Sequence, residues 1–448
     1  MRYTIKNTPC GQIRGADTQT GISYFLNIPY ATARRWERPE IVTGWEGIYD
    51  ATTPTPWCPQ AATFSSEVTG ASRFYGYENV VKQVIRYSED CQRLNIWVPD
   101  GAENAPVLVF IHGGGYLTGG STAVSFSGEG YARKGLVAVT INYRLNVFAS
   151  AVGGGHTGNY GLWDQITALQ WLRSNIAAFG GDPSRVTIVG ESAGAMSVQN
   201  LIYSPLAKGL FHRAIMMSGG GIFPGVFSIN TNETVQKLWE EVRITLGAPD
   251  WEAMQETDPA LLFKTWSRVV AEGKYVTPGT PIIDGITIPA SPRTLAETGQ
   301  VNNVPMMIGL LSEDMWPHML YKIAVEWGQL MADANLGPVY GYYFDRQLPG
   351  SDDGAWHGCD IRYAFGTLHT CWRPFDEIDH RISRNMMDCF ASFAAGGQPA
   401  PAPLATWEPI TKDSCRFYHF GDEPCAMVDV PEARLQATQA TRKPFPSR

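Results

Sequence analysis

Residues 186–194 have the sequence VTIVGESAG, an apolar run that leads directly into a serine between two glycines. A short apolar run suits a buried β-strand, and residues 193–203 favour a helix. Between a strand and a helix, Gly-x-Ser-x-Gly is typical of a nucleophile elbow, a sharp turn that places the serine above the sheet. Side chains at positions 190 and 194 would clash in that turn, and the helix N-terminus favours negative charge developing near Ser192. Ser192 is therefore the candidate nucleophile.

On its own this motif is weak evidence, because a long, glycine-rich chain often contains it by chance as a simple turn. It occurs once here, where the predicted strand meets the predicted helix. Short apolar runs alternate with helical or loop segments around it, at residues 107–111, 137–141, 186–189, 214–217 and 306–310. This alternation predicts an α/β fold with a mostly parallel central sheet and helices on both faces. We expect residues 1–448 to form a single domain.

A second glycine-rich segment, His112-Gly113-Gly114-Gly115-Tyr116, follows the predicted strand at 107–111. Consecutive glycines let backbone N–H groups approach a ligand, and the tetrahedral intermediate of an ester needs two or three such donors for its oxyanion. We assign these donors to Gly114, Gly115 and Ala193. The alternative is a flexible glycine turn. A dinucleotide site is excluded for this segment, because residues 113–118 do not form G-x-G-x-x-G with its acidic partner.

Charge and length exclude other classes of protein. The chain has 448 residues and a net charge of −8, from 43 acidic and 35 basic side chains, without a Lys/Arg-rich block. We therefore expect no nucleic-acid partner. No apolar run approaches the roughly 18 residues of a membrane span. No signal peptide is visible, which leaves a cytoplasmic or a processed secreted protein. The eight cysteines show no metal-binding spacing, so we expect no metal site.

Several motifs together resemble the type-B carboxylesterases, a family that includes cholinesterase-like enzymes. They are the two glycine segments above, Ser88-Glu89-Asp90-Cys91 with Leu94-Asn95-Ile96, and NIAAFGGD at residues 175–182. The resemblance extends from Gly11 to about Phe420. It implies the α/β-hydrolase fold, a Ser–acid–His triad, and hydrolysis of a small-molecule ester without a cofactor.

The resemblance also identifies the acid and the base. The family's acid lies in a segment that matches residues 309–314, which implies Asp314, where most members have Glu; the neighbouring Glu313 is the alternative. The family's histidine lies in a segment that matches residues 353–358, which implies His357. The order Ser192, Asp314, His357 is the order of α/β-hydrolases. Seven other histidines are present, but none has both this position in the order and the Gly-x-x-His-Gly setting.

The chain departs from the family at two places. Asp314 and His357 are 43 positions apart, fewer than family members commonly have, so we expect a more open or differently covered site. The loop at residues 153–156 replaces the family's usual compact turn, and it could reshape the pocket wall. Both departures weaken any transfer of substrate preference.

Further roles are implied by the resemblance or by position. Glu191 and Ser218 match residues that support the triad, although Ser218 could equally be a turn residue. Cys58 and Cys91 match a family disulfide; the alternative is two free thiols in a reducing cytosol. Three aromatic residues flank triad or oxyanion elements and are candidate pocket residues or, equally, core residues: Tyr116, Phe223 and Trp316.

These residues predict acyl transfer. His357 takes the proton from Ser192, the alkoxide attacks the ester, and Asp314 stabilises the imidazolium. Two alternatives remain from the sequence. An acyltransferase or a lactone-forming enzyme would use the same triad with a different acceptor. A binding or adhesion protein can share the fold, but such members usually lose the triad.

Overall fold

One mixed β-sheet runs through this protein. The computed structural model describes residues 2–18, 20–64, 78–80, 83–222, 232–273, 279–400 and 406–441. Within them the sheet has 13 strands, in the order β1-β2-β3-β7-β9-β8-β12-β13-β14-β15-β16-β17, with β6 paired to β2. We propose that the chain is one domain, because its first and last strands belong to this sheet.

The central strands are parallel, as predicted. They are β9 (Val137–Ile141), β8 (Ala105–Ile111), β12 (Gly181–Glu191), β13 (Arg213–Met217), β14 (Met306–Leu311), β15 (Val339–Phe344) and β16 (Phe417–Phe420). Antiparallel strands extend both ends of the sheet: β1 (Arg2–Thr8), β2 (Gly11–Asp17), β3 (Ile22–Pro29) and β7 (Arg93–Pro99) at one, and β17 (Met427–Val428) at the other. Strand β6 (Ile48–Asp50) pairs with β2 in parallel.

Two separate cores lie on the two faces of the sheet. In β8, Val107, Val109 and Ile111 contribute to one core. The alternating residues Leu108 and Phe110 contribute to the other. Because successive side chains of a strand point to opposite faces, this division shows that β8 is buried on both sides. The uniform apolar run at residues 107–111 is the sequence signature of that position.

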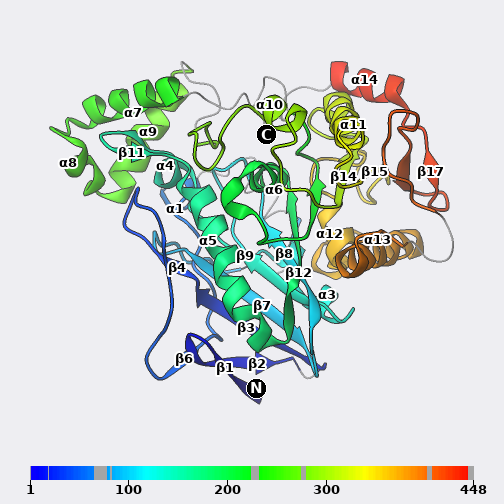
Figure 1. The fold of residues 1–448 in the computed structure, drawn as a ribbon, viewed down its shortest axis with the longest axis horizontal. Helices are drawn as coiled ribbons and strands as arrows, with labels where there is room; N and C mark the ends of the chain where they lie inside the picture. The colour runs from blue at the N-terminus through cyan, green and yellow to red at the C-terminus, as the bar shows by residue number, and fades with distance from the viewer. Residues whose placement is uncertain are drawn as a thin grey trace.

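Helices cover both faces. The first core contains side chains of α5 (Tyr160–Asn175), α6 (Ala193–Tyr203) and α11 (Pro317–Asp333). The second contains side chains of α3 (Glu129–Ala132), α12 (Ile361–Phe365) and α13 (Glu377–Gly396). Figure 1 shows α5 on one side of β8, β9 and β12, and α13 on the other. Helices on both faces of a mostly parallel sheet confirm the predicted α/β architecture.

The remaining helices lie further from the central strands. At one end, seen at the upper left of Figure 1, is a group of three: α7 (Asn232–Leu246), α8 (Trp251–Gln255) and α9 (Pro259–Ala271). The others are α1 (Ala61–Phe64), α4 (Asn146–Ala149), α10 (Pro292–Glu297) and α14 (Glu432–Thr441). None of the helices in the described ranges is long and apolar enough to cross a membrane.

The loop at residues 153–156 forms a small hairpin between β10 (Val152–Gly153) and β11 (His156–Thr157). It packs against α8: a side chain added at Gly154 would lie 2.1 Å from the ring of Trp251. The His156 ring also contacts Trp36 and Trp251. The hairpin therefore packs against the α7–α9 group and Trp36. Its predicted effect on the pocket wall stays a prediction.

Candidate active site

The nucleophile elbow forms where β12 ends and α6 begins. Ser192 has φ 57° and ψ −122°, a backbone conformation that an L-residue rarely adopts. A Cβ at Gly190 would lie 2.2 Å from the carbonyl carbon of Gly194, and one at Gly194 would lie 2.1 Å from the Ile111 oxygen. Both glycines are therefore required by space, as the sequence predicted. The Ser192 N–H donates to the Met217 carbonyl at 2.9 Å, which fixes the elbow to β13.

The candidate acid and base are in direct contact. Nδ1 of His357 lies 2.6 Å from Oδ1 of Asp314, whose side chain is fully buried. The Met315 N–H donates to the same carboxylate oxygen at 2.7 Å. Burial would raise the pKa of Asp314, but the His357 charge, the hydrogen bonds from His357 and Met315, and the influence of the Ser218 side chain outweigh it, so this pKa is lowered. Asp314 is therefore held as a carboxylate beside the imidazole.

The other nitrogen of the imidazole faces Glu191. Nε2 of His357 lies 3.3 Å from Oε1 of Glu191, the residue before the candidate nucleophile. No hydrogen bond joins the Ser192 hydroxyl to His357 among the described residues. In ligand-free enzymes such bonds are often long and tighten when substrate binds. Nε2 therefore lies next to the carboxylate of Glu191, the residue that precedes the serine it is predicted to deprotonate.

Buried carboxylates dominate the electrostatics of His357. Burial alone would lower the pKa of His357. The charges of Asp314 and Glu191 have the opposite and larger effect, so the pKa of His357 is raised to about 9. Burial raises the pKa of Glu191 to about 8, although the His357 charge opposes this. Because a general base must be neutral, these carboxylates extend the protonated, inactive form of the histidine to higher pH.

A third buried carboxylate, Asp360, was missed by the sequence analysis. It is fully buried, and the Tyr342 hydroxyl donates to its Oδ2 at 2.9 Å. Burial raises the pKa of Asp360 to about 7, and its charge contributes to the raised pKa of His357. The sequence feature that could have identified Asp360 is its position three residues after His357, at the start of α12. A single acidic residue near a histidine was not informative without the fold.

The predicted oxyanion loop lies against the elbow. A Cβ at Gly113 would lie 2.5 Å from the Glu191 carbonyl oxygen and 3.1 Å from the Ser192 Cβ. Three consecutive residues then have positive φ: Gly114 (106°), Gly115 (66°) and Tyr116 (61°). A Cβ at Gly114 would lie 2.2 Å from the Thr118 oxygen, whereas at Gly115 the space is open. The structure thus brings the candidate donors Gly114, Gly115 and Ala193 to the same end of the sheet as the serine.

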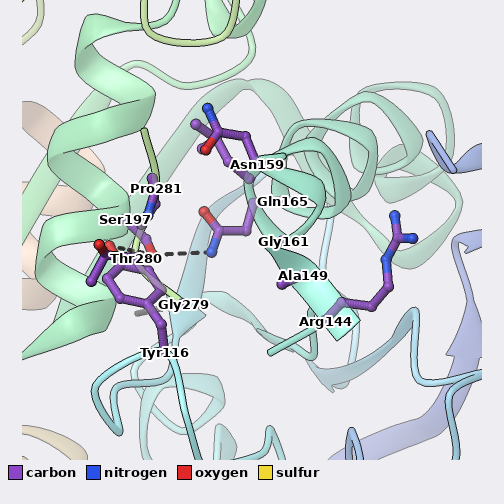
Figure 2. Close-up of a pocket in the computed structure, with 11 residues that line it drawn as sticks. Tyr116, Arg144, Ala149, Asn159, Gly161, Gln165, Ser197, Gly279, Thr280 and Pro281 are labelled. Carbon is purple, nitrogen blue, oxygen red and sulfur yellow. Dashed lines mark hydrogen bonds between the residues drawn. The ribbon is translucent and has the colours of Figure 1, made fainter. Parts of the chain in front are cut away.

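Tyr116 points into the interior and not toward solvent. It is only 5% exposed, and its hydroxyl accepts hydrogen bonds from Ser197 Oγ at 3.5 Å and Asn200 Nδ2 at 3.4 Å, both on α6. Gln165 of α5 donates to Ser197 at 3.0 Å. Figure 2 shows Tyr116, Gln165 and Ser197 among the residues around a small cavity of about 20 Å³. Tyr116 therefore joins the oxyanion loop to the nucleophile helix, and its predicted contact with substrate stays a prediction.

The other predicted residues have mixed outcomes. Trp316 is half-buried at the start of α11, two residues after Asp314, so it stays a candidate pocket residue. Phe223 lies outside the described residues. Ser218 is buried directly after β13, and its side chain contributes to the lowered pKa of Asp314; its supporting role stays a prediction. Cys58 and Cys91 are free buried thiols in this structure, and interaction with the Cys58 side chain is the largest cause of the raised pKa of Cys91.

Glu313, the alternative acid, points away from the imidazole. Its Oε2 accepts the Ala355 N–H at 2.9 Å, and its Oε1 accepts from Arg434 at 3.0 Å. The observed geometry thus favours Asp314. No group of His, Cys, Asp or Glu suited to a metal ion occurs in the described part of the chain.

Comparisons with known proteins agree with this geometry. The model of the carboxylesterase family matches residues 2–326 and 313–439. Para-nitrobenzyl esterase of Bacillus subtilis is 29% identical, with 100% of both chains covered. The cocaine esterase of Homo sapiens is 34% identical over 96% of this chain and 90% of its own. A structure titled thermophilic PNB esterase superimposes with a TM-score of 0.85 at 25% identity, covering 98% of this chain and 100% of its own.

Proposed function

Since this chain belongs to the carboxylesterase family and is a carboxylic ester hydrolase, we propose that it forms an acyl-enzyme on Ser192 with His357 and Asp314 as base and acid. The observation that carries the proposal is the buried contact of 2.6 Å between His357 and Asp314, next to the elbow that presents Ser192. In this arrangement Asp314 fixes the tautomer of the imidazole, so that Nε2 is free to accept a proton.

Acylation begins when His357 removes the Ser192 proton through Nε2 and the serine oxygen attacks the ester carbonyl. The carbonyl oxygen becomes negative, and the N–H groups of Gly114, Gly115 and Ala193 bind it. The imidazolium, stabilised by the buried Asp314 carboxylate, then protonates the departing alcohol. The acyl group remains on Ser192.

Deacylation repeats these steps with water. His357 removes a proton from the water molecule, which attacks the acyl-enzyme, and the carboxylic acid leaves as Ser192 is protonated again. The relatives are named as esterases, which supports water and not a second alcohol as the acceptor.

A labelling experiment tests the proposal. A serine-directed organophosphate should modify Ser192 alone, with loss of p-nitrophenyl acetate hydrolysis in proportion to labelling. Ser192→Ala should abolish both labelling and turnover, while Ser174→Ala, an exposed serine on α5, should leave both unchanged. Modification of a different serine, or turnover by Ser192→Ala, would refute the role of Ser192.

A further inference from the structure

Glu313 and Ala355 exchange two hydrogen bonds directly beside the catalytic pair. The Ala355 N–H donates to Glu313 Oε2 at 2.9 Å, and the Glu313 N–H donates to the Ala355 carbonyl at 3.2 Å. A parallel β-bridge also joins Glu313 to Trp356. Asp314 is the residue after Glu313, and His357 is two residues after Ala355. The contact therefore lies between the two short segments that carry the acid and the base.

We propose that Glu313 is a positioning residue that holds the loop of His357 against the strand end of Asp314, and that Arg434 of α14 orients its carboxylate. This inference rests on the proposed roles of Asp314 and His357. We name the two hydrogen bonds between Glu313 and Ala355 the Glu313 clamp.

The loop is shaped to fit the carboxylate. Gly354, which precedes Ala355, has φ 70°, and a Cβ there would lie 2.7 Å from the carboxyl carbon of Glu313. Ala355 itself is fully buried. A residue other than glycine at 354 would push the carboxylate away from the Ala355 N–H, so the close approach of loop and side chain is built into the backbone.

Arg434 contacts the other carboxylate oxygen. Its Nη2 lies 3.0 Å from Glu313 Oε1 and its Nη1 lies 3.7 Å from Asp345. The Arg434 side chain is 49% exposed, and exposed ion pairs contribute only about 0–1 kcal/mol to stability. We therefore infer that Arg434 orients the Glu313 carboxylate: its guanidinium binds Oε1, which leaves Oε2 facing the Ala355 N–H.

Helix α14 is itself attached to the segment that follows the acid. Glu432 lies 2.8 Å from Nε2 of His318 on α11, and Gln439 accepts the Met319 N–H at 3.0 Å. Figure 1 shows α14 beside α11 at the upper right. Arg434 thus reaches Glu313 from a helix that contacts α11 near both of its ends.

The chemistry explains why such a device is needed here. Aspartate is shorter than glutamate by one methylene, so the backbone at Asp314 must come closer to the imidazole than a glutamate would require. A displacement of about 1 Å at a catalytic group can cost about 10²-fold in rate. The Glu313 clamp links the two backbones within three residues of the bond between Asp314 and His357, which keeps that distance at 2.6 Å.

Three variants and a control test the proposal. Glu313→Ala removes the acceptor of the Ala355 N–H and should lower kcat about 10- to 100-fold, with KM within twofold. Glu313→Gln keeps a carbonyl acceptor and should restore kcat to within about threefold of the parent. Arg434→Ala should lower kcat about two- to fivefold. The control Glu326→Ala loses a surface ion pair with Arg293 but has no contact with the loop, so its kcat should not change.

The outcomes are distinguishable. If Glu313→Ala matches Glu326→Ala in kcat, or if Glu313→Gln is as slow as Glu313→Ala, the positioning role is wrong. Circular dichroism and thermal unfolding check folding, and Arg434→Ala provides a surface change should Glu313→Ala not fold. Turnover by Ser192→Ala would instead overturn the proposed function, whatever the clamp variants show.

Discussion

The carboxylate of Glu191 lies 3.3 Å from Nε2 of His357, at the ring nitrogen opposite to the one that Asp314 holds. The imidazole is thus between two buried acids, and its pKa is raised to about 9. The neutral form of a histidine, which acts as the base, becomes the major form only above its pKa. The esterase should therefore gain activity with rising pH through the neutral and mildly alkaline range.

Glu191→Gln tests this arrangement. Removing the negative charge removes one contribution to the raised pKa of His357, so the acid limb of the pH profile of kcat/KM should move to lower pH. At pH 7 a larger share of the variant would then carry a neutral base. The measurement is kcat/KM for p-nitrophenyl acetate between pH 6 and about pH 10. An unmoved limb would show that Glu191 does not control the base.

Asp314→Asn should lower kcat by up to about 10⁴, because an amide in place of the carboxylate leaves the imidazole in the wrong tautomer. Steady-state kinetics together with a check of thermal unfolding measure the effect. Glu313→Gln should lower kcat far less, by no more than about threefold, because Glu313 does not contact the ring. The reverse order of the two effects would move the acid to Glu313.

Gly114→Ala should lower kcat by about 10²–10³, the usual cost of losing one oxyanion donor. The added methyl would lie 2.2 Å from the Thr118 oxygen, so the loop must move. Gly115→Ala is the comparison, because a Cβ there meets open space. It should lose less kcat. A rise in KM alone in Gly114→Ala would mean that the loop binds substrate without stabilising the transition state.

Tyr116→Phe should lower kcat about three- to tenfold at nearly constant KM, because it disconnects the oxyanion loop from α6 while keeping the aromatic ring. The control is Tyr131→Phe in the other core, where the hydroxyl donates to the Ala364 carbonyl at 2.6 Å. Both variants lose a buried hydroxyl contact, which costs roughly 1–3 kcal/mol in unfolding free energy. Equal kcat values in the two variants would show that Tyr116 matters for stability only.

The sequence was sufficient for features that local sterics dictate. Glycines at 190 and 194 are imposed by contacts within the elbow, so the motif predicted the turn. The buried parallel strands were visible as apolar runs, because both of their faces pack. The antiparallel strands β1–β3 were not predicted, since no uniform apolar run marks them and β1 has no buried residue.

Contacts between distant residues were beyond reach. Asp360 acts on His357 only because α12 starts beside the triad, and Arg434 reaches Glu313 across 121 positions. The inward direction of Tyr116 depends on three consecutive residues with positive φ, which no propensity describes. Each of these three features depends on the path of the folded backbone, which the periodicity of the sequence does not predict.

The position of Arg434 also sets an order of events during synthesis. Arg434 is added 121 residues after Glu313, and after Ser192, Asp314 and His357. At about 5–20 residues per second, a ribosome needs about 6–24 s to cover that stretch. Throughout this interval the emerging chain holds its nucleophile without the arginine that orients the Glu313 carboxylate. Full hydrolytic competence therefore arrives late in translation, and a ribosome stalled before position 434 would display a serine of reduced reactivity.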